Sequence, residues 1–256
     1  MLQAHRLMLR DRHLVYLDAG GEGTPVLALH GHYARARTFD RLGAALAPRH
    51  RVVALEQRGH GRSSPAEDYG REGYLADAAH AIEALRLAPA VVLGHSLGGV
   101  NAYQLAARRP ELVRAVIVED APALVPPSAD PAPFAGLPRR FTSLRALRDA
   151  TWDEDFLLES MFEDDDGWGL RFDADRLDES RRRLTGDHWG DWLASHQPAL
   201  LLRGARSDFL SREHAREMAA RRPHTRLVEV PGAGHGIHDD DPEGYALAVA
   251  SFLDAI

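Results

Sequence analysis

The chain has 256 residues, 45% of them hydrophobic, with a net charge of −7 and no cysteine. A chain of this size and composition is expected to fold as one domain around a single core. The missing cysteine excludes disulfides and a cysteine nucleophile, and the acidic balance argues against a nucleic-acid partner.

The N-terminal segment before residue 13 is interrupted by charged residues. It lacks the apolar run of a signal peptide, and no stretch of the chain approaches the roughly 20 apolar residues of a membrane span. We therefore expect a cytoplasmic protein that does not bind membranes. Its expected partner is a small-molecule substrate, and it is expected to be a monomer or a homodimer.

Strand-like and helix-like segments alternate along the first half of the chain. Short apolar runs predict strands at 13–17, 25–29, 51–55, 90–93 and 113–118, and apolar residues at helical spacing predict helices at 35–47, 72–87 and 97–109. This alternation is typical of a mostly parallel sheet with helices on both faces. Functional residues are then expected in the loops at the carboxyl ends of the strands.

The pattern changes between residues 121 and 197. This segment is proline-rich at first, then helical in pattern, and it contains all the tryptophans of the chain. Strands at 199–202 and 226–230 and helices at 211–222 and 242–253 follow it. We predict an α/β core formed by residues 1–120 and 198–256, into which residues 121–197 are inserted as a helical cap.

The sequence Gly94-His95-Ser96-Leu97-Gly98 has the form GxSxG and lies between a predicted buried strand and a predicted helix. In this context the motif marks a sharp strand-to-helix turn that exposes a nucleophilic serine. The helix that begins after Ser96 directs free N–H groups at a developing oxyanion, and the N–H of Leu97 is the first of them.

Together with the serine turn, four other segments occur in a characteristic order: 29–32, 57–63, 203–208 and 232–235. With these landmarks the chain resembles the α/β-hydrolase family, in particular its cap-bearing esterase, lactonase and C–C bond hydrolase branch. The resemblance implies an α/β-hydrolase fold with a mostly parallel sheet of the eight-stranded type. It also implies a hydrolytic enzyme that requires neither a metal ion nor an organic cofactor.

The resemblance also assigns roles to individual residues. Ser96 is expected to be the nucleophile of a Ser–His–Asp triad, His235 the base and Asp208 the acid, in the chain order of α/β-hydrolases. Asp120, which follows the strand at 113–118, is the alternative acid. The backbone N–H groups of His32 and Leu97 are expected to form the oxyanion hole.

Two other patterns in the sequence have alternative interpretations. His238 precedes three aspartates, Asp239 to Asp241, and could indicate a metal site; the resemblance instead places this run at the start of the last helix. The arginines at 139–140 and 181–183 could bind a substrate carboxylate, but a solvated surface is the preferred interpretation.

The predicted reaction is hydrolysis of a small to medium carboxylic ester or lactone through an acyl-enzyme on Ser96. Cleavage of a C–C bond, or cofactor-free peroxidase or lyase chemistry, could use the same residues. A ligand receptor that turns its ligand over slowly is a further possibility of a different class.

Overall fold

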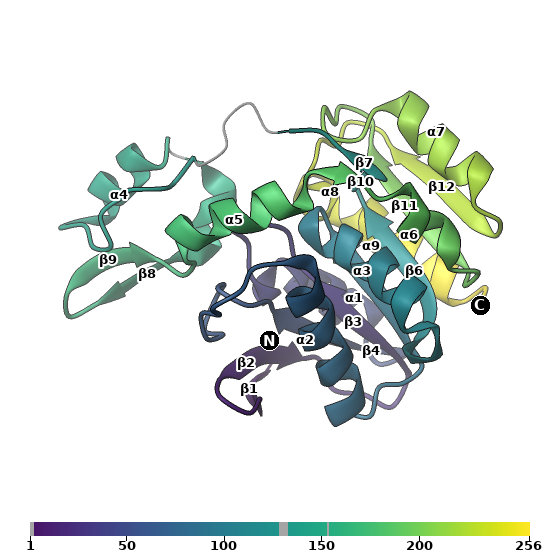
Figure 1. Cartoon of the computed structure of the whole chain (residues 1–256), viewed down its shortest axis with the longest axis horizontal. Helices are drawn as coiled ribbons and strands as arrows, with labels where there is room; N and C mark the ends of the chain where they lie inside the picture. The colour runs from purple at the N-terminus through teal and green to yellow at the C-terminus, as the bar shows by residue number, and fades with distance from the viewer. Residues whose placement is uncertain (1–2, 128–132, 153) are drawn as a thin grey trace.

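A computed structural model describes residues 3–127, 133–152 and 154–256 (Figure 1). Met1 and Leu2 of the N-terminal segment, and residues 128–132 and 153 of the predicted cap, lie outside the described residues. The core is an eight-stranded sheet with the strand order β1-β2-β4-β3-β5-β6-β11-β12. It is the α/β-hydrolase fold that the sequence predicts, with helices on both faces of the sheet.

Seven of these strands lie where the sequence predicts them, and each extends its predicted run by one or two residues. β3, β4, β5, β6, β11 and β12 run parallel to one another, and β2 runs antiparallel to β4. The strands are β2 (His13–Asp18), β3 (Thr24–Leu29), β4 (His50–Glu56), β5 (Ala90–His95), β6 (Val113–Glu119), β11 (Ala199–Gly204) and β12 (Thr225–Val230). All residues of β5 and β11 are buried, because helices cover both faces of the sheet there.

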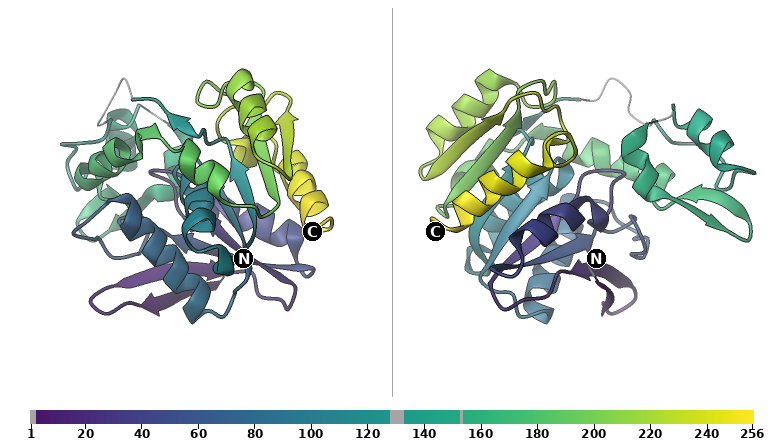
Figure 2. Two further views of the ribbon diagram at one scale, coloured as in Figure 1. Left: turned by 45° about the vertical axis from the view of Figure 1, so that its right-hand side comes forward. Right: turned by 180° about the vertical axis from the view of Figure 1, so that it is seen from behind.

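The helices divide between the two faces of the sheet, and successive strand residues feed two separate cores. In β3, Leu27 joins the core on the side of α2 (Arg71–Ala84) and α3 (Leu97–Arg108), whereas Val26 joins the core on the other side. That second side is covered by η1 (Ala36–Phe39), α1 (Asp40–Leu46) and α9 (Pro242–Leu253), and Figure 2 shows the two layers. The remaining core elements are η2 (Pro110–Leu112) and α7 (Arg212–Arg221).

The segment between residues 121 and 197 contains short strands as well as helices. Its elements are β7 (Leu124–Val125), α4 (Leu144–Ala150), η3 (Asp155–Ser160), β8 (Met161–Asp164), β9 (Gly167–Leu170), α5 (Ala174–Leu184), β10 (Gly186–Asp187) and α6 (Trp189–Ala194). β8 and β9 form an antiparallel hairpin, and β7 pairs with β10. The hairpin and α4 project away from the sheet (Figures 1 and 2).

The last helix of this segment, α6, belongs spatially to the core. Trp192 is fully buried, and its ring lies 5.6 Å from that of Tyr103 on α3 in an edge-to-face arrangement. Its indole N–H donates to the carbonyl of Met218 on α7. One of the tryptophans that marked the segment in the sequence therefore serves core packing.

Two elements differ from expectation. β1 (Gln3–Met8) was not predicted; it pairs antiparallel with β2 at the edge of the sheet, and almost all of its residues are exposed, so it carries no clear apolar pattern. The run after His235 forms a separate short helix, α8 (Ile237–Asp240), rather than the start of α9. Within the ranges that the structure describes, no helix is both long enough and apolar enough to cross a bilayer.

Candidate active site

Ser96 occupies the turn between β5 and α3 at the carboxyl edge of the sheet. Its backbone has φ 52° and ψ −115°, a left-handed conformation that costs free energy in a non-glycine residue. The N–H of Ser96 donates to the carbonyl of Glu119 at the end of β6, at 3.0 Å. The neighbouring strand thus holds the strained turn in place.

Glycines make this turn possible because backbone segments approach closely on both sides of it. A Cβ atom at Gly94 would lie 2.0 Å from the carbonyl oxygen of Gly98, and a Cβ at Gly98 would lie 1.9 Å from that of Leu29. The oxygen of Gly98 belongs to the first turn of α3 and that of Leu29 to β3, so neither can move away without disrupting a helix or a strand. The glycines of the GxSxG motif are therefore required by packing.

The loop after β3 passes directly beside the serine. A Cβ atom on Gly31 would lie 3.3 Å from the Cβ of Ser96. His30 holds this loop: its Nε2 accepts from the N–H of Gln57, so its Nδ1 carries the proton and donates to the carbonyl of Gly31. Burial lowers the pKa of His30 well below its usual value, so this ring stays neutral.

Two backbone N–H groups are available next to the serine. Leu97 is the first residue of α3, so its N–H has no acceptor within the helix. The N–H of His32, which follows Gly31, has no protein acceptor among the described residues. These are the two groups that are expected to form the oxyanion hole.

His235 lies in the loop that follows β12. Its Nδ1 is 2.8 Å from Oδ2 of Asp120, and its side chain is 40% exposed while that of Asp120 is fully buried. The ring of His235 also lies 4.6 Å from that of His95, the residue before Ser96. The structure thus brings a half-exposed imidazole to the serine turn, with a buried carboxylate behind it.

Asp120 is positioned by contacts on every side of its carboxylate. It follows β6 with φ 47°, and its N–H donates to the carbonyl of Leu202 in β11. Oδ1 accepts from the N–H of Gly204 at 3.2 Å, and Oδ2 accepts from the hydroxyl of Ser207 as well as from His235. Three donors therefore hold this carboxylate in one orientation.

The structure corrects the predicted partner of His235, which is Asp120 rather than Asp208. Asp208 is exposed and lines a groove of about 530 Å³ together with Leu124 and Phe209. The residue of this turn that points inward is Ser207, which is buried and donates to Asp120. Neighbouring residues of the turn face opposite directions, so the predicted acid faces solvent.

His32 also connects the site to the segment inserted after β6. Its Nε2 lies 2.9 Å from the hydroxyl of Ser180 on α5, and that hydroxyl donates to Tyr74 of α2. Burial lowers the pKa of His32 well below its usual value, and the nearby charges of His60, Arg181 and Arg71 add to this effect.

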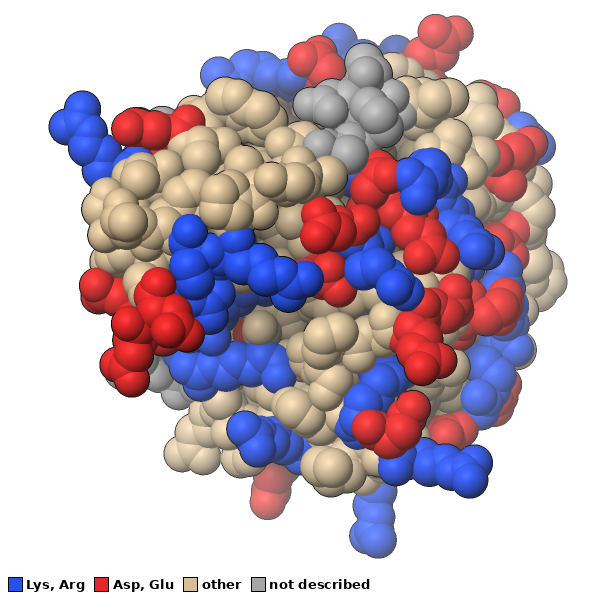
Figure 3. Space-filling model, turned by 60° about the vertical axis from the view of Figure 1, so that its left-hand side comes forward, with Lys and Arg blue, Asp and Glu red and all other residues tan. Residues whose placement is uncertain are grey.

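Most of the arginines singled out in the sequence pair with acidic neighbours at the surface. Arg140 pairs with Asp164, Arg182 with Asp178 and Arg183 with Glu179. On the face seen in Figure 3, arginine and acidic side chains lie interspersed. Arg181 is half-buried, and its charge contributes to the lowered pKa of His32.

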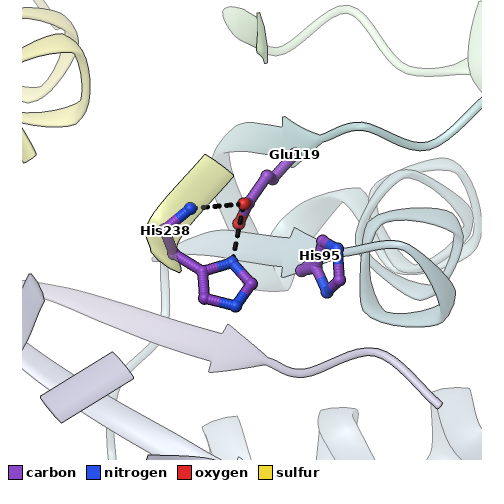
Figure 4. Close-up of side chains that lie close together, drawn as sticks. All are labelled: His95, Glu119 and His238. Atoms are coloured by element: carbon purple, nitrogen blue, oxygen red, sulfur yellow. Dashed lines mark hydrogen bonds and ion pairs between the residues drawn. The ribbon is translucent and has the colours of Figure 1, made fainter. Parts of the chain in front are cut away.

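A second histidine–carboxylate pair lies behind the first and was not predicted (Figure 4). Oε1 of Glu119 accepts from both the backbone N–H and the Nδ1–H of His238, at 3.0 and 2.7 Å. His95, Glu119 and His238 are all buried. The sequence signal was the pair of consecutive acids at the end of an apolar strand, of which only Asp120 was considered.

The cluster of His95, Glu119 and His238 is also where a metal ion could be held. Their ligand atoms lie within 4.8 Å of one another. The three aspartates after His238 do not join it as a ligand set; Asp239 alone approaches the imidazole, with Oδ2 at 3.4 Å from Nε2. Asp240 instead accepts from the N–H of Gly234.

Comparisons with known proteins identify the class. A sequence profile of the alpha/beta hydrolase family matches residues 26–249, most of the chain. This chain therefore belongs to the alpha/beta hydrolase family, as its landmarks indicated. The members it resembles include hydrolases and esterases.

Two relatives and one solved structure show which kinds of hydrolase the chain is similar to. The 2-(acetamidomethylene)succinate hydrolase of Mesorhizobium japonicum is 30% identical over 92% of this chain and 90% of its own length. The 3-hydroxybutyrate-oligomer hydrolase of Cupriavidus necator is 30% identical, covering 94% and 93%. A crystal structure of E-2-(acetamidomethylene)succinate hydrolase superposes with a TM-score of 0.87 at 25% identity, covering 99% of this chain and all of the other.

Proposed function

We propose that the protein is a serine hydrolase that cleaves a small to medium carboxylic ester or lactone through an acyl-enzyme on Ser96. His235 is the base, Asp120 orients it, and the N–H groups of His32 and Leu97 stabilise the oxyanion. The observation that carries this proposal is the 2.8 Å contact between His235 and the buried Asp120, beside the strained turn of Ser96.

The contact with Asp120 fixes the tautomer of His235. Because Nδ1 donates to the carboxylate, Nε2 is the unprotonated, basic nitrogen. In the proposed reaction, Nε2 takes the proton of the Ser96 hydroxyl while the serine oxygen attacks the substrate carbonyl. The negative oxygen of the tetrahedral intermediate accepts hydrogen bonds from the two backbone N–H groups.

The second half of the cycle reuses the same groups. The imidazolium of His235 returns its proton to the leaving alkoxide, and the carboxylate of Asp120, hydrogen-bonded to Nδ1, stabilises the imidazolium until it does so. Water then attacks the acyl-enzyme with His235 again as base, which releases the acid and restores Ser96. The side chain of His235 is 40% exposed, which gives that water access.

Aromatic residues pack together beside the loop of His32. Tyr33 and Phe134 are buried in this cluster, and Trp152 is its exposed ring. The ring of Tyr33 lies 4.8 Å from that of Phe134 and 5.1 Å from that of Phe172. Trp152 lies 5.7 Å from Phe134 and is 60% exposed. Its exposed ring favours an apolar or aromatic group on the substrate.

A carboxylate on the substrate is a second element of the proposal. Arg181 and Arg71 both act electrostatically on His32, whose N–H is assigned to the oxyanion hole. Arg71 donates to the amide oxygens of Gln104 and Asn101, which are uncharged partners. The succinate in the name of one relative gives the same indication.

The first experiment is hydrolysis of p-nitrophenyl esters of increasing chain length, with lactones, 3-hydroxybutyrate oligomers and 2-(acetamidomethylene)succinate alongside. The native protein is compared with Ser96→Ala. We expect hydrolysis of at least one ester or lactone and its loss in the variant. Activity that survives in Ser96→Ala would contradict the proposal. Turnover of 2-(acetamidomethylene)succinate alone, which is neither an ester nor a lactone, would show that the enzyme cleaves a different kind of bond.

The carboxylate is tested with two matched substrates, p-nitrophenyl acetate and mono-p-nitrophenyl succinate. We expect Arg181→Gln to raise KM for the succinate ester about tenfold and to leave the acetate ester unchanged. Arg182→Gln, at the exposed neighbouring position that pairs with Asp178, is the control for loss of charge. Equal effects of both variants on both esters would exclude a carboxylate site at Arg181.

A further inference from the structure

Two consecutive carboxylates at the end of β6 each hold a histidine of the same short segment. Asp120 contacts His235, and Glu119 contacts His238 on α8. The two pairs differ in their surroundings. The Glu119–His238 pair is closed off on the side of the sheet where η1 and α9 pack, with Phe39 and Tyr245 against the imidazole.

The Glu119–His238 pair is a carboxylate and an imidazolium. Burial alone would raise the pKa of Glu119, but the nearby imidazole of His238 and the two hydrogen bonds that His238 donates lower it to about 2. Burial alone would lower the pKa of His238, but Glu119 and Asp239 raise it to about 10. At neutral pH both groups are charged and bonded to each other.

His95 connects this pair to the catalytic loop. Its ring lies 4.8 Å from that of His238 and 4.6 Å from that of His235. Its Nε2 donates to the backbone carbonyl of His235 at 3.0 Å. Burial lowers the pKa of His95 to about 3, so the ring is neutral and its one N–H is committed to that carbonyl.

α8 holds the other end of the same loop. Oδ2 of Asp240 accepts from the N–H of Gly234 at 2.7 Å, one residue before His235. His238 in turn anchors α8 to β6, because both its backbone N–H and its ring bond to Glu119. The N–H of Gly234 is therefore tied to α8, which the Glu119–His238 pair anchors to β6. The carbonyl of His235 is tied to His95, whose ring packs against that of His238.

We propose that Glu119 and His238 form a buried hydrogen-bonded dyad that positions His235, with His95 as the link between the dyad and the loop. Both dyad members act through His235 and neither touches the substrate. The proposal rests on the proposed function for the assignment of His235 as the base. The position of His235 in its loop depends on the contacts with His95 and α8, whichever reaction the protein catalyses.

The charged and titratable groups that face His238 come from several elements. They are His95 on β5, Glu119 on β6, Asp239 on α8, Glu159 on η3 and Tyr245 on α9. Three of these groups are acids, so they stabilise the protonated ring. A divalent cation bound through Nε2 of His238 would instead require that nitrogen to be unprotonated.

The experiment compares Glu119→Gln, His238→Gln and the double variant with the native protein. Asp77→Asn is the matched control, because Asp77 is equally buried and paired with Arg58 and Arg12. Two measurements are made: kcat and KM on the best ester, and the downfield ¹H NMR signal of the Nδ1 proton that His235 shares with Asp120. That signal is assigned by its loss in Asp120→Asn.

For each dyad variant we expect a roughly 10- to 100-fold lower kcat with KM within about twofold, since misplacing a base affects the reaction step more than binding. The downfield signal should shift or broaden at a temperature where the variant remains folded. The double variant should be no worse than the more damaging single variant, because the pair acts as a unit. Asp77→Asn should lower Tm and leave kcat and the signal unchanged.

The NMR signal separates the two proposals. If the native protein cleaves no ester or lactone, the proposed function fails, and a signal displaced in Glu119→Gln still supports the dyad. An unchanged signal and an unchanged kcat in folded Glu119→Gln would overturn the dyad. One equivalent of bound metal that disappears in Glu119→Gln would also overturn it and assign the cluster to a cation.

Discussion

Two histidine–carboxylate pairs lie side by side at the carboxyl end of β6, and they are built for different tasks. In one, His235 is 40% exposed above a buried Asp120. In the other, His238 and Glu119 are both buried, and the imidazole has 8% of its side-chain surface exposed. A carboxylate and an imidazole form both pairs, and the two carboxylates are consecutive in the chain, yet one pair is open and the other is closed.

Exposure is what separates the two roles. An imidazole that exchanges protons with a substrate and with water must keep a free ring nitrogen at an open surface. His235 has such a nitrogen, because only its Nδ1 is engaged by Asp120. In His238, Nδ1 bonds to Glu119 and Nε2 lies 3.4 Å from Asp239, so both nitrogens face acids. The closed pair can hold structure, and the open pair can carry chemistry.

The largest effect should come from breaking the open pair. We expect Asp120→Asn to lower kcat/KM for the best ester roughly 10³- to 10⁴-fold, because the amide favours the wrong tautomer of His235. Asp208→Asn makes the same chemical change at the acid expected from the sequence, and it should remain within about twofold of the native value. The measurement is steady-state hydrolysis by the three proteins.

The reverse ranking of these two variants would return the acid role to Asp208. Equal, small effects would show that neither carboxylate orients the base. Since both substitutions replace Asp by Asn, the comparison is free of differences in side-chain volume.

A smaller effect should follow from removing one support of Asp120. Ser207→Ala deletes the hydroxyl that donates to Oδ2 of Asp120, and we expect kcat to fall about tenfold. Ser211→Ala deletes a nearby serine whose side chain caps α7 by accepting from His214. It should cost about 1 kcal/mol of unfolding free energy and leave kcat unchanged. A loss of kcat in Ser211→Ala would show that kcat responds to general loosening of this region.

The closed pair, Glu119 and His238, should make the free energy of unfolding depend on pH. The pKa of His238 is raised from 6.5 to about 10, so its contribution is complete below pH 6.5 and is lost as the pH rises toward 10. The pKa of Glu119 is lowered from 4.5 to about 2, so its contribution is complete above pH 4.5 and is lost as the pH falls toward 2.

Urea unfolding of the native protein at pH 6 and pH 9.5 measures the alkaline part of this dependence. We expect lower stability at pH 9.5, and a smaller difference between the two pH values in His238→Gln. A native protein as stable at pH 9.5 as at pH 6 would contradict the charged dyad.

The sequence sufficed to predict the parallel strands of the sheet and the turn at Ser96, because both depend on local patterns. Apolar runs place the parallel strands within a few residues. Gly94 and Gly98 lie so close to backbone oxygens that no other residue fits, which is why the turn has a recognisable motif. The exposed edge strand β1 and the hairpin β8–β9 lack such runs. Their pairing partners, rather than their composition, define them.

The acid could not be chosen from the sequence because two aspartates follow parallel strands at the same edge of the sheet. The choice depends on which side chain turns inward, and that is decided by tertiary contacts. Asp120 bonds to Gly204 and Ser207, whereas Asp208 faces solvent. The pairing of Glu119 with His238 is likewise a contact across 119 positions of the chain that no local pattern reveals.

The central claim is that Ser96 is the nucleophile, and covalent labelling tests it most directly. Native protein, Ser96→Ala and Asp120→Asn are treated with a fluorophosphonate, and the adducts are located by intact mass and peptide mapping. We predict one adduct on Ser96 in the native protein, none in Ser96→Ala and slower labelling in Asp120→Asn. A native protein that stays unlabelled, or that is labelled on another residue, would contradict the claim.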